Sequence, residues 1–223
     1  MRGNQKNKNY IIKWTPEFAY AIGLITTDGC LSKDDRHIIF VSKDKCLVQT
    51  FKNCLDLDCK IGSRKSSFTE KKYYHVQFSN TKLYRYLLEI GLFPNKSKTL
   101  GKLKIPDKYF FDFLRGHFDG DGSFYSYWDK RWKNSFTFYT KFLSASEKHI
   151  LWLRSRIKNL ININGSLDKN RVVYQLKYAK RESEKILTGI YYSKNLPCLE
   201  RKYYKVRQAQ VMELGRHASL RRM

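Results

Sequence analysis

The chain has 223 residues, of which 44 are Lys or Arg and 20 are Asp or Glu, so its formal net charge is +24. An apolar share of 42% is typical of a globular protein and excludes a largely disordered chain. This charge favours a polyanionic partner, and nucleic acid fits best because no apolar run reaches the roughly 18 residues of a membrane-spanning helix. We therefore expect no association with membranes.

Residues 1–13 are polar and basic and lack the apolar core of a secretory signal. We expect them to form a basic N-terminal arm on a protein that is not secreted. We expect it to work in the compartment where its gene is encoded, either a bacterial or phage-host cytoplasm or an organelle matrix. The five cysteines form no CxxC pair and have no His at zinc spacing, which predicts free thiols in a reducing compartment.

The first predicted helix starts at Thr15, a capping residue followed by Pro16, and runs about 13 residues through the segment Ala21-Ile-Gly-Leu-Ile-Thr-Thr-Asp-Gly29. A similar segment, Leu114-Arg-Gly-His-Phe-Asp-Gly-Asp-Gly122, occurs in the second part of the chain. Its helix is expected to start at Asp107. In both segments we expect the final glycine to end the helix in the left-handed conformation.

Small residues recur four apart in each helix, at Gly23 and Thr27 and at Gly116 and Gly120. Residues four apart share one helix face, so the two helices are predicted to pack closely together on these faces. No large side chain would then separate them.

Each helix ends on an aspartate, Asp28 or Asp121. A helix C-terminus carries partial negative charge, which disfavours a carboxylate there. Two such carboxylates on adjoining helices predict a cation between them, and a hard divalent ion such as Mg²⁺ prefers these oxygen ligands. The alternative, that each Asp-Gly pair is only a turn signal, does not account for two copies with matched flanks.

The two segments resemble the LAGLIDADG motif of homing endonucleases, and two motifs in one chain resemble the single-chain form of that family. The resemblance implies that Asp28 and Asp121 bind metal, with the backbone carbonyls of Thr27 and Gly120 completing the metal shell. Mg²⁺ is the expected ion, and Mn²⁺ or Ca²⁺ could occupy the same site.

The resemblance also implies a basic residue in each half near the scissile phosphate, and Lys96 and Lys202 stand at matching points of the repeat. Two residues depart from the motif. Thr26 replaces an acid, which puts the local support of that helix end in doubt, and His117 occupies a position that is usually apolar. We expect His117 to be a partly buried packing residue.

The flanks of the motifs repeat as well, each reading helix, strand, strand, helix, strand, strand, helix. This predicts an α+β fold of two pseudo-symmetric αββαββα halves packed through their LAGLIDADG helices. Each half carries an antiparallel four-stranded sheet, and the two sheets form a DNA-binding saddle. The expected halves are 14–100 and 107–210, with the linker ending over 101–106 and a basic C-terminal tail over 211–223.

Strand alternation divides the strand residues between the core and the saddle. Val76, Phe78, Phe138 and Phe142 are expected in the core, together with Val172. The residues expected to contact DNA are Ser32, His37, Lys43, Arg64, Tyr73, His75, Gln77, Tyr125, Tyr127, Thr137, Tyr139, Lys141, Gln175 and Lys177. Phosphate contacts are expected from Arg64, Lys65, Lys71, Lys72, Lys130, Arg131 and Lys133.

The leading hypothesis is a site-specific double-strand DNA endonuclease that uses divalent metal, cuts a long asymmetric target and promotes intron homing. It would act as a monomer whose two halves form a pseudo-dimer. One alternative is an RNA maturase that aids splicing, with host intron RNA as its partner. The other is a non-catalytic, sequence-specific DNA-binding protein, although such a protein has no reason to keep two acids at adjoining helix ends.

Overall fold

A computed structural model describes residues 11–65, 71–132 and 135–220. The first half contains α1 (Pro16–Asp28), β1 (Gly29–Leu31), β2 (His37–Ser42), α2 (Lys45–Cys54), β3 (Gly62–Lys65), β4 (Lys72–Ser79) and α3 (Thr81–Glu89). The second half contains α4 (Phe110–Asp121), β5 (Ser123–Trp128), β6 (Phe136–Ser144), α5 (Glu147–Ile161), β7 (Ser166–Asn170), β8 (Val173–Tyr178) and α6 (Lys180–Ile190), followed by α7 (Glu200–Leu220).

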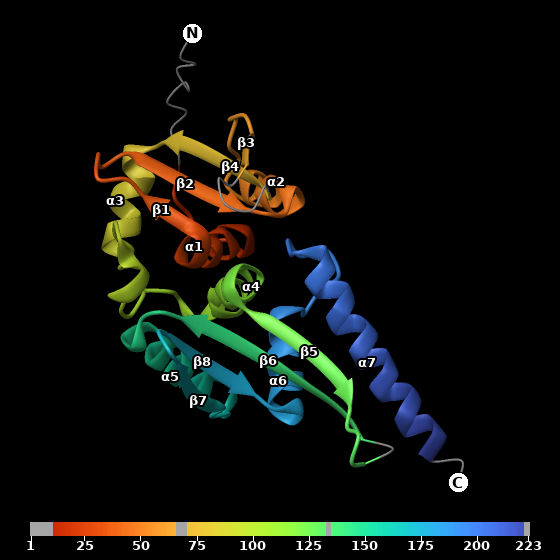
Figure 1. Ribbon diagram of the computed structural model, residues 1–223. Helices are drawn as coiled ribbons and strands as arrows, with labels where there is room; N and C mark the ends of the chain where they lie inside the picture. The colour runs from red at the N-terminus through yellow and green to blue at the C-terminus, as the bar shows by residue number, and fades with distance from the viewer. Residues whose placement is uncertain (1–10, 66–70, 133–134, 221–223) are drawn as a thin grey trace.

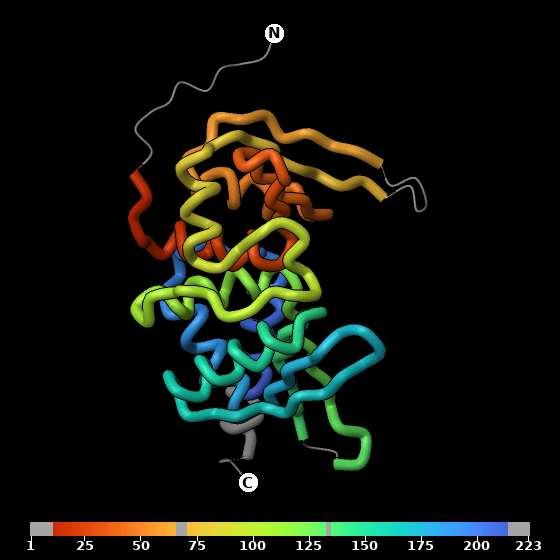
Figure 2. Tube along the Cα trace, turned by 90° about the vertical axis from the view of Figure 1, so that its left-hand side faces the viewer, coloured from red at the N-terminus to blue at the C-terminus, as the bar shows by residue number. Residues whose placement is uncertain are grey.

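The two halves repeat one topology, which confirms the predicted αββαββα order. Each has a four-stranded antiparallel sheet, with strand order β1-β2-β4-β3 in the first half and β5-β6-β8-β7 in the second. Figure 1 shows the sheets above and below a central pair of helices, α1 and α4. The side view in Figure 2 shows the connecting segment, in yellow-green, crossing from one half to the other.

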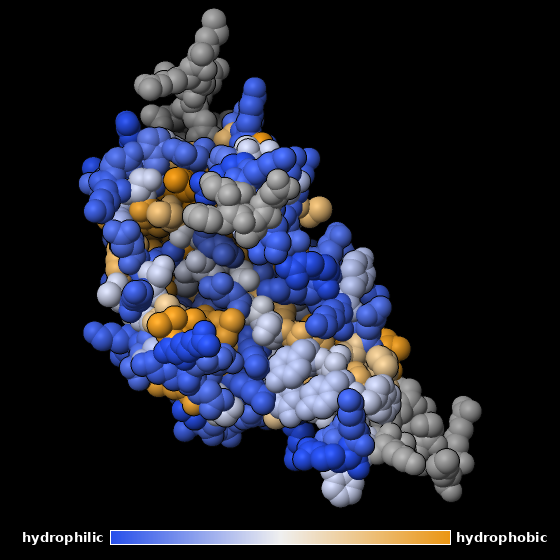
Figure 3. Space-filling model, viewed as in Figure 1, coloured by the Kyte–Doolittle hydropathy of each residue, from blue (hydrophilic) through white to orange (hydrophobic). Residues whose placement is uncertain are grey.

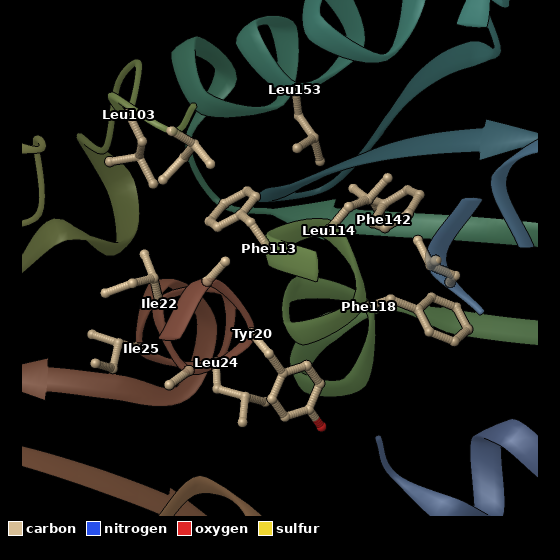
Figure 4. Close-up of a cluster of buried hydrophobic side chains, with 14 of the residues drawn as sticks. Tyr20, Ile22, Leu24, Ile25, Leu103, Phe113, Leu114, Phe118, Phe142 and Leu153 are labelled. Carbon is tan, nitrogen blue, oxygen red and sulfur yellow. The ribbon is translucent and has the colours of Figure 1, made fainter. Parts of the chain in front are cut away.

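Glycines set the contact between α1 and α4. A Cβ atom on Gly23 would lie 2.7 Å from the backbone nitrogen of His117 and closer still to the carbonyl oxygen of Phe113. A Cβ atom on Gly116 would lie 3.0 Å from the carbonyl carbon of Tyr20. The two helices therefore touch backbone to backbone, as the small-residue spacing predicted, with large apolar side chains around the contact (Figure 4).

The first motif helix starts as predicted, because the Thr15 hydroxyl accepts a hydrogen bond of 3.1 Å from the backbone N–H of Phe18. The second does not start at Asp107. Residues Asp107–Tyr109 form a 3-10 turn, and α4 itself begins at Phe110. The Asp107 carboxylate pairs with Arg156 on α5, 2.5 Å away, instead of capping α4.

The left-handed conformation expected at the end of each motif helix is wrong. Gly29 (φ −88°, ψ 150°) and Gly122 (φ −74°, ψ 159°) are both extended, because the chain passes directly from helix into strand. Glycine is needed for space instead. A Cβ atom would lie 2.6 Å from the Cα of Ile25 at the first position and 2.5 Å from the carbonyl oxygen of Phe118 at the second.

The predicted core faces of the sheets are confirmed, since Val76, Phe78, Phe138 and Phe142 are all buried. The prediction for Val172 is wrong. That residue lies in the turn between β7 and β8 and is 72% exposed. Strand alternation does not extend into a turn.

The boundary expected at residue 210 falls inside α7, which runs to Leu220. Val206 and Ala209 are buried, and Glu213 pairs with Lys180 of α6 at 2.6 Å. These contacts attach the helix to the second half alongside β5. None of the helices among the described residues is both long and apolar enough to cross a membrane.

Replacing Gly116 by Ala should destabilise the protein by about 2 kcal/mol or more, because the added methyl group meets backbone that cannot rotate away. Urea unfolding measures the change. Gly101→Ala is the matched control, since a Cβ atom there meets nothing within 4 Å. Equal stability of the two variants would contradict the backbone contact.

Candidate metal and nucleic-acid site

The helix contact brings the two motif aspartates together. Asp28 and Asp121 are the last residues of α1 and α4. A Cβ atom on Gly120 would lie 2.9 Å from Oδ2 of Asp28 and 2.8 Å from the Cβ of Thr27. The Asp28 carboxylate therefore lies against Gly120 of α4, the residue that precedes Asp121.

The surroundings of these carboxylates disfavour their charged forms. Burial raises the pKa of Asp28 to about 6, and the nearby Asp121 carboxylate adds to the increase. Burial also raises the pKa of Asp121. Lys202 and Lys96 oppose both changes, since their positive charges lower the pKa of each carboxyl.

The donor atoms suit a hard divalent cation. Both carboxylates and the carbonyls of Thr27 and Gly120 offer oxygen atoms, and the carbonyls belong to helix ends that lack intrahelical partners. A cation between Asp28 and Asp121 would relieve their mutual repulsion. Among the described residues, no three His, Cys, Asp or Glu side chains converge to hold an ion alone. Waters or oxygens from a bound partner would complete its shell.

The two candidate lysines occupy equivalent places at the helix ends. Lys96, which is buried, donates a hydrogen bond to the carbonyl of Gly29, the residue after Asp28. Lys202 donates to the carbonyls of Phe118 (2.6 Å), Asp119 (2.9 Å), Gly120 (3.4 Å) and Gly122 (2.6 Å) at the end of α4. Each lysine therefore places positive charge at the negative end of a helix dipole.

Burial lowers the pKa of both lysines, to about 8 for Lys202. Lys202 therefore stays mostly protonated at neutral pH and can act as a cation beside a phosphate.

The two motif departures have different structural consequences. In the second half the buried Asp119 carboxylate accepts hydrogen bonds from the Tyr20 hydroxyl (2.8 Å) and the Leu199 backbone (2.7 Å). It thus ties α1, α4 and the start of α7 together. Thr26, its counterpart, donates only to the carbonyl of Ile22 in its own helix, at 2.7 Å. The first half lacks this cross-connection.

His117 is a packing residue, buried more deeply than predicted. Its ring lies against Phe113, Phe142 and His149, with 3.3 Å between the Nε2 atoms of the two histidines. Burial lowers the pKa of His117, so the ring is neutral and does not take part in the charge arrangement of the aspartates.

Most of the predicted DNA-contact residues lie on the faces of the sheets turned away from the core, called the open faces below. In the second half Tyr125, Tyr127 and Tyr139 stack on one another. The Nζ of Lys177 lies 4.1 Å from the centre of the Tyr139 ring, and that of Lys141 lies 4.9 Å from the Tyr125 ring. Figure 3 shows these strands as a pale patch bordered by hydrophilic side chains.

In the first half the open face carries the predicted β4 residues Tyr73, His75 and Gln77. Lys43 lies over the Tyr73 ring at 5.6 Å, and Arg64 is opposite Tyr73 on the edge strand β3.

The remaining predicted contact residues differ in their surroundings. The His37 ring pairs with Asp34, Ser32 adjoins it at the far end of the sheet, and Arg131 pairs with Asp129. Thr137 and Gln175 lie on the open face of the second sheet, while Lys133 lies outside the described residues.

The open faces also contain residues that the sequence analysis passed over: Cys30, Ile39, Val41 and Leu143. Each follows a buried residue, and Ile39 lies between two of them, Ile38 and Phe40. Alternation alone would have found them. They were missed because apolar side chains are usually assigned to the core.

Comparison with known proteins gives a consistent fold. No family model and no curated protein matches the sequence. Among solved structures, the homing endonuclease I-WcaI bound to its DNA recognition sequence is similar over 92% of this chain and 95% of its own, with TM-score 0.60 and 18% identity. I-DmoI in complex with DNA and Mn is similar over 80% and 98%, with TM-score 0.51 and 21% identity.

The chain has the LAGLIDADG fold. Full-length DUF199/WhiA from Thermatoga maritima is also similar, over 92% of this chain and 68% of its own, with TM-score 0.55 and 16% identity. At these identities the likeness concerns the fold alone. What this chain does depends on its own residues.

The raised pKa of Asp28 predicts a pH-dependent stability. Because its folded-state pKa of about 6 exceeds the ordinary 3.8, the folded protein holds a proton that the unfolded chain releases between these values. The free energy of unfolding should therefore fall as pH rises through this interval, in buffer containing EDTA.

Asp28→Asn should remove part of this decrease and be more stable than the unmodified protein at pH 7.5, measured by urea unfolding. Asp58→Asn, on the exposed loop after α2, is the control and should behave like the unmodified protein. An Asp28→Asn variant less stable than the parent at pH 7.5 would contradict the strained carboxylate pair.

Proposed function

We propose that this chain is a site-specific, divalent-metal-dependent endonuclease that cuts both strands of a long, asymmetric DNA target. The observation that carries the proposal is the pair of carboxylates at the ends of two helices packed through Gly23 and Gly116. The repulsion between these carboxylates costs stability, and a bound cation would relieve it. The fold is shared with structures described as homing endonucleases bound to DNA.

Asp28 and Asp121 would each hold divalent metal, together with the carbonyls of Thr27 and Gly120. A bound ion of this kind neutralises phosphate charge and lowers the pKa of a bound water. Each carboxylate would serve one DNA strand, so that a single asymmetric molecule makes a double-strand break.

Lys96 and Lys202 would stabilise the negative charge that develops on the phosphate during hydrolysis. Their ammonium groups are already held at the ends of α1 and α4 by backbone carbonyls, so little reorganisation is needed when DNA binds. Lys202 remains mostly charged at neutral pH because its pKa is lowered only to about 8.

The two sheets would hold the duplex by their open faces. A β-ribbon can enter the major groove, where amides, hydroxyls and lysines match base edges. The net charge of +24 supplies a large, salt-dependent attraction to phosphate. Binding should therefore weaken steeply as salt increases.

A DNA-binding protein that does not cut is the second candidate. The similarity to WhiA favours it, because that structure is not described as an endonuclease. The maturase role, with intron RNA as partner, and a role in intron homing remain predictions from the sequence.

A pooled library of duplex targets separates the two candidates. Incubated with Mg²⁺, the protein should cut a small set of sequences on both strands, and EDTA should abolish cutting. Mn²⁺ should also support cutting. Tight binding to a selected sequence, without cleavage in either metal, would favour the non-cutting protein and contradict the proposal.

Single substitutions should affect cleavage of the two DNA strands differently. Asp28→Asn and Asp121→Asn remove one carboxylate each, so each should lower double-strand cleavage of a selected target at least 100-fold while binding changes less than about 3-fold. Residual nicking should fall on opposite strands in the two variants. Strand-specific end labels on denaturing gels report both outcomes.

Asp58→Asn is again the matched control and should cut like the parent. Unchanged double-strand cleavage in either of the two motif variants would remove that aspartate from the mechanism.

A further inference from the structure

The strand register aligns one row of residues next to Asp28. Cys30 on β1 pairs with Ile39 on β2, and Ile39 pairs with Gln77 on β4. We call these three residues the first row. Cys30 stands two residues after Asp28, so this row crosses the sheet close to the carboxylate pair.

The second half has a structurally equivalent row. Ser123 on β5 pairs with Lys141 on β6, and Lys141 pairs with Lys177 on β8. These three residues form the second row. Ser123 stands two residues after Asp121, just as Cys30 stands two residues after Asp28.

Both rows face away from the core. In the first sheet the neighbours of Ile39, Ile38 and Phe40, are buried, and in the second Phe142 and Leu176 are buried beside Lys141 and Lys177. The row side chains are half-buried or exposed. A duplex lying along both sheets would therefore meet the two rows at similar distances from the carboxylate pair.

The two rows differ in chemistry. The first is uncharged, with the apolar side chain of Ile39 beside the exposed amide of Gln77. In the major groove an apolar side chain fits the methyl group of thymine, and a Gln amide forms paired hydrogen bonds with adenine. This combination suits an A·T pair. Figure 3 shows hydrophobic atoms among the hydrophilic ones over β1 and β2.

The second row places Lys141 directly opposite Lys177, and like charges in that position destabilise a sheet. The tyrosine rings beneath them hold both ammonium groups in place, and Lys141 also donates to Gln175 at 3.4 Å. Two cations held in this way on a face that would meet base edges need acceptors. Guanine offers O6 and N7, and Lys is one of the side chains that contact them.

We propose that the two rows read different base pairs at equivalent places in the two half-sites, an A·T pair at the first row and a G·C pair at the second. This inference rests on the proposed binding of double-stranded DNA but does not depend on cleavage. The asymmetry of the target would then begin next to the cutting centre.

Exchanging the row residues between the two halves tests the proposal. Ile39→Lys with Gln77→Lys gives the first half the lysines of the second row, and Lys141→Ile with Lys177→Gln makes the reverse exchange. Binding selection from a random duplex pool, in EDTA and followed by sequencing, measures base preference without cleavage. Lys82→Gln, exposed on α3, is the charge control, and circular dichroism melting checks that each variant folds.

The parent protein should select A·T at one position and G·C at the equivalent position across the centre, each by roughly 10-fold or more. The first exchange should convert A·T to G·C in its own half-site only, and the second should do the opposite. Lys82→Gln should select the parent sequence.

Weaker binding to every sequence, with unchanged base preference, would show that Lys141 and Lys177 contact phosphate and would overturn the inference. A pool that yields no enriched sequence from the folded parent would overturn it too. Enrichment of the predicted pairs without any cleavage in Mg²⁺ would instead overturn the endonuclease and leave the two rows intact.

Discussion

The backbone contact between α1 and α4 is the constraint on which the rest of the structure depends. Because Gly23 and Gly116 have no side chains, the helices approach until backbone meets backbone. That approach fixes the distance between the two halves and places Asp28 beside Gly120, next to Asp121. The same contact joins the sheets to one central unit, since β1 follows α1 directly and β5 follows α4 directly. One interface thus sets both the candidate metal site and the candidate DNA platform.

The two halves share one topology but carry different residues at equivalent positions. Both sheets have the same strand order, and both candidate lysines reach the end of a motif helix. The support around the lysines differs, because Asp119 connects three helices while Thr26 bonds only within its own. On the proposed function, the two strands of an asymmetric duplex would meet two non-identical centres.

The sequence was sufficient for the fold because its signals were repeated. Two glycine-bearing helices, two sets of alternating strands and matched spacings predicted the halves, the helix contact and the open faces. The conformation of single residues was harder to predict from the sequence. Gly29 and Gly122 were expected to be left-handed, yet each is extended, and a side chain at either position would collide with the preceding helical turn, a local steric constraint that a capping rule does not include. Asp107 likewise pairs with Arg156, a partner that only folding reveals.

The central claim is that Asp28 and Asp121 form one coupled carboxylate pair, and carbon-13 NMR of the aspartate carboxyl groups tests it most directly. In metal-free protein Asp28 should titrate with a pKa of about 6. Replacing Asp121 by Asn should lower that pKa part of the way toward 3.8, because burial still raises it after the neighbouring charge is gone. An Asp28 pKa near 4 in the parent, or one that does not respond to Asp121→Asn, would contradict the account.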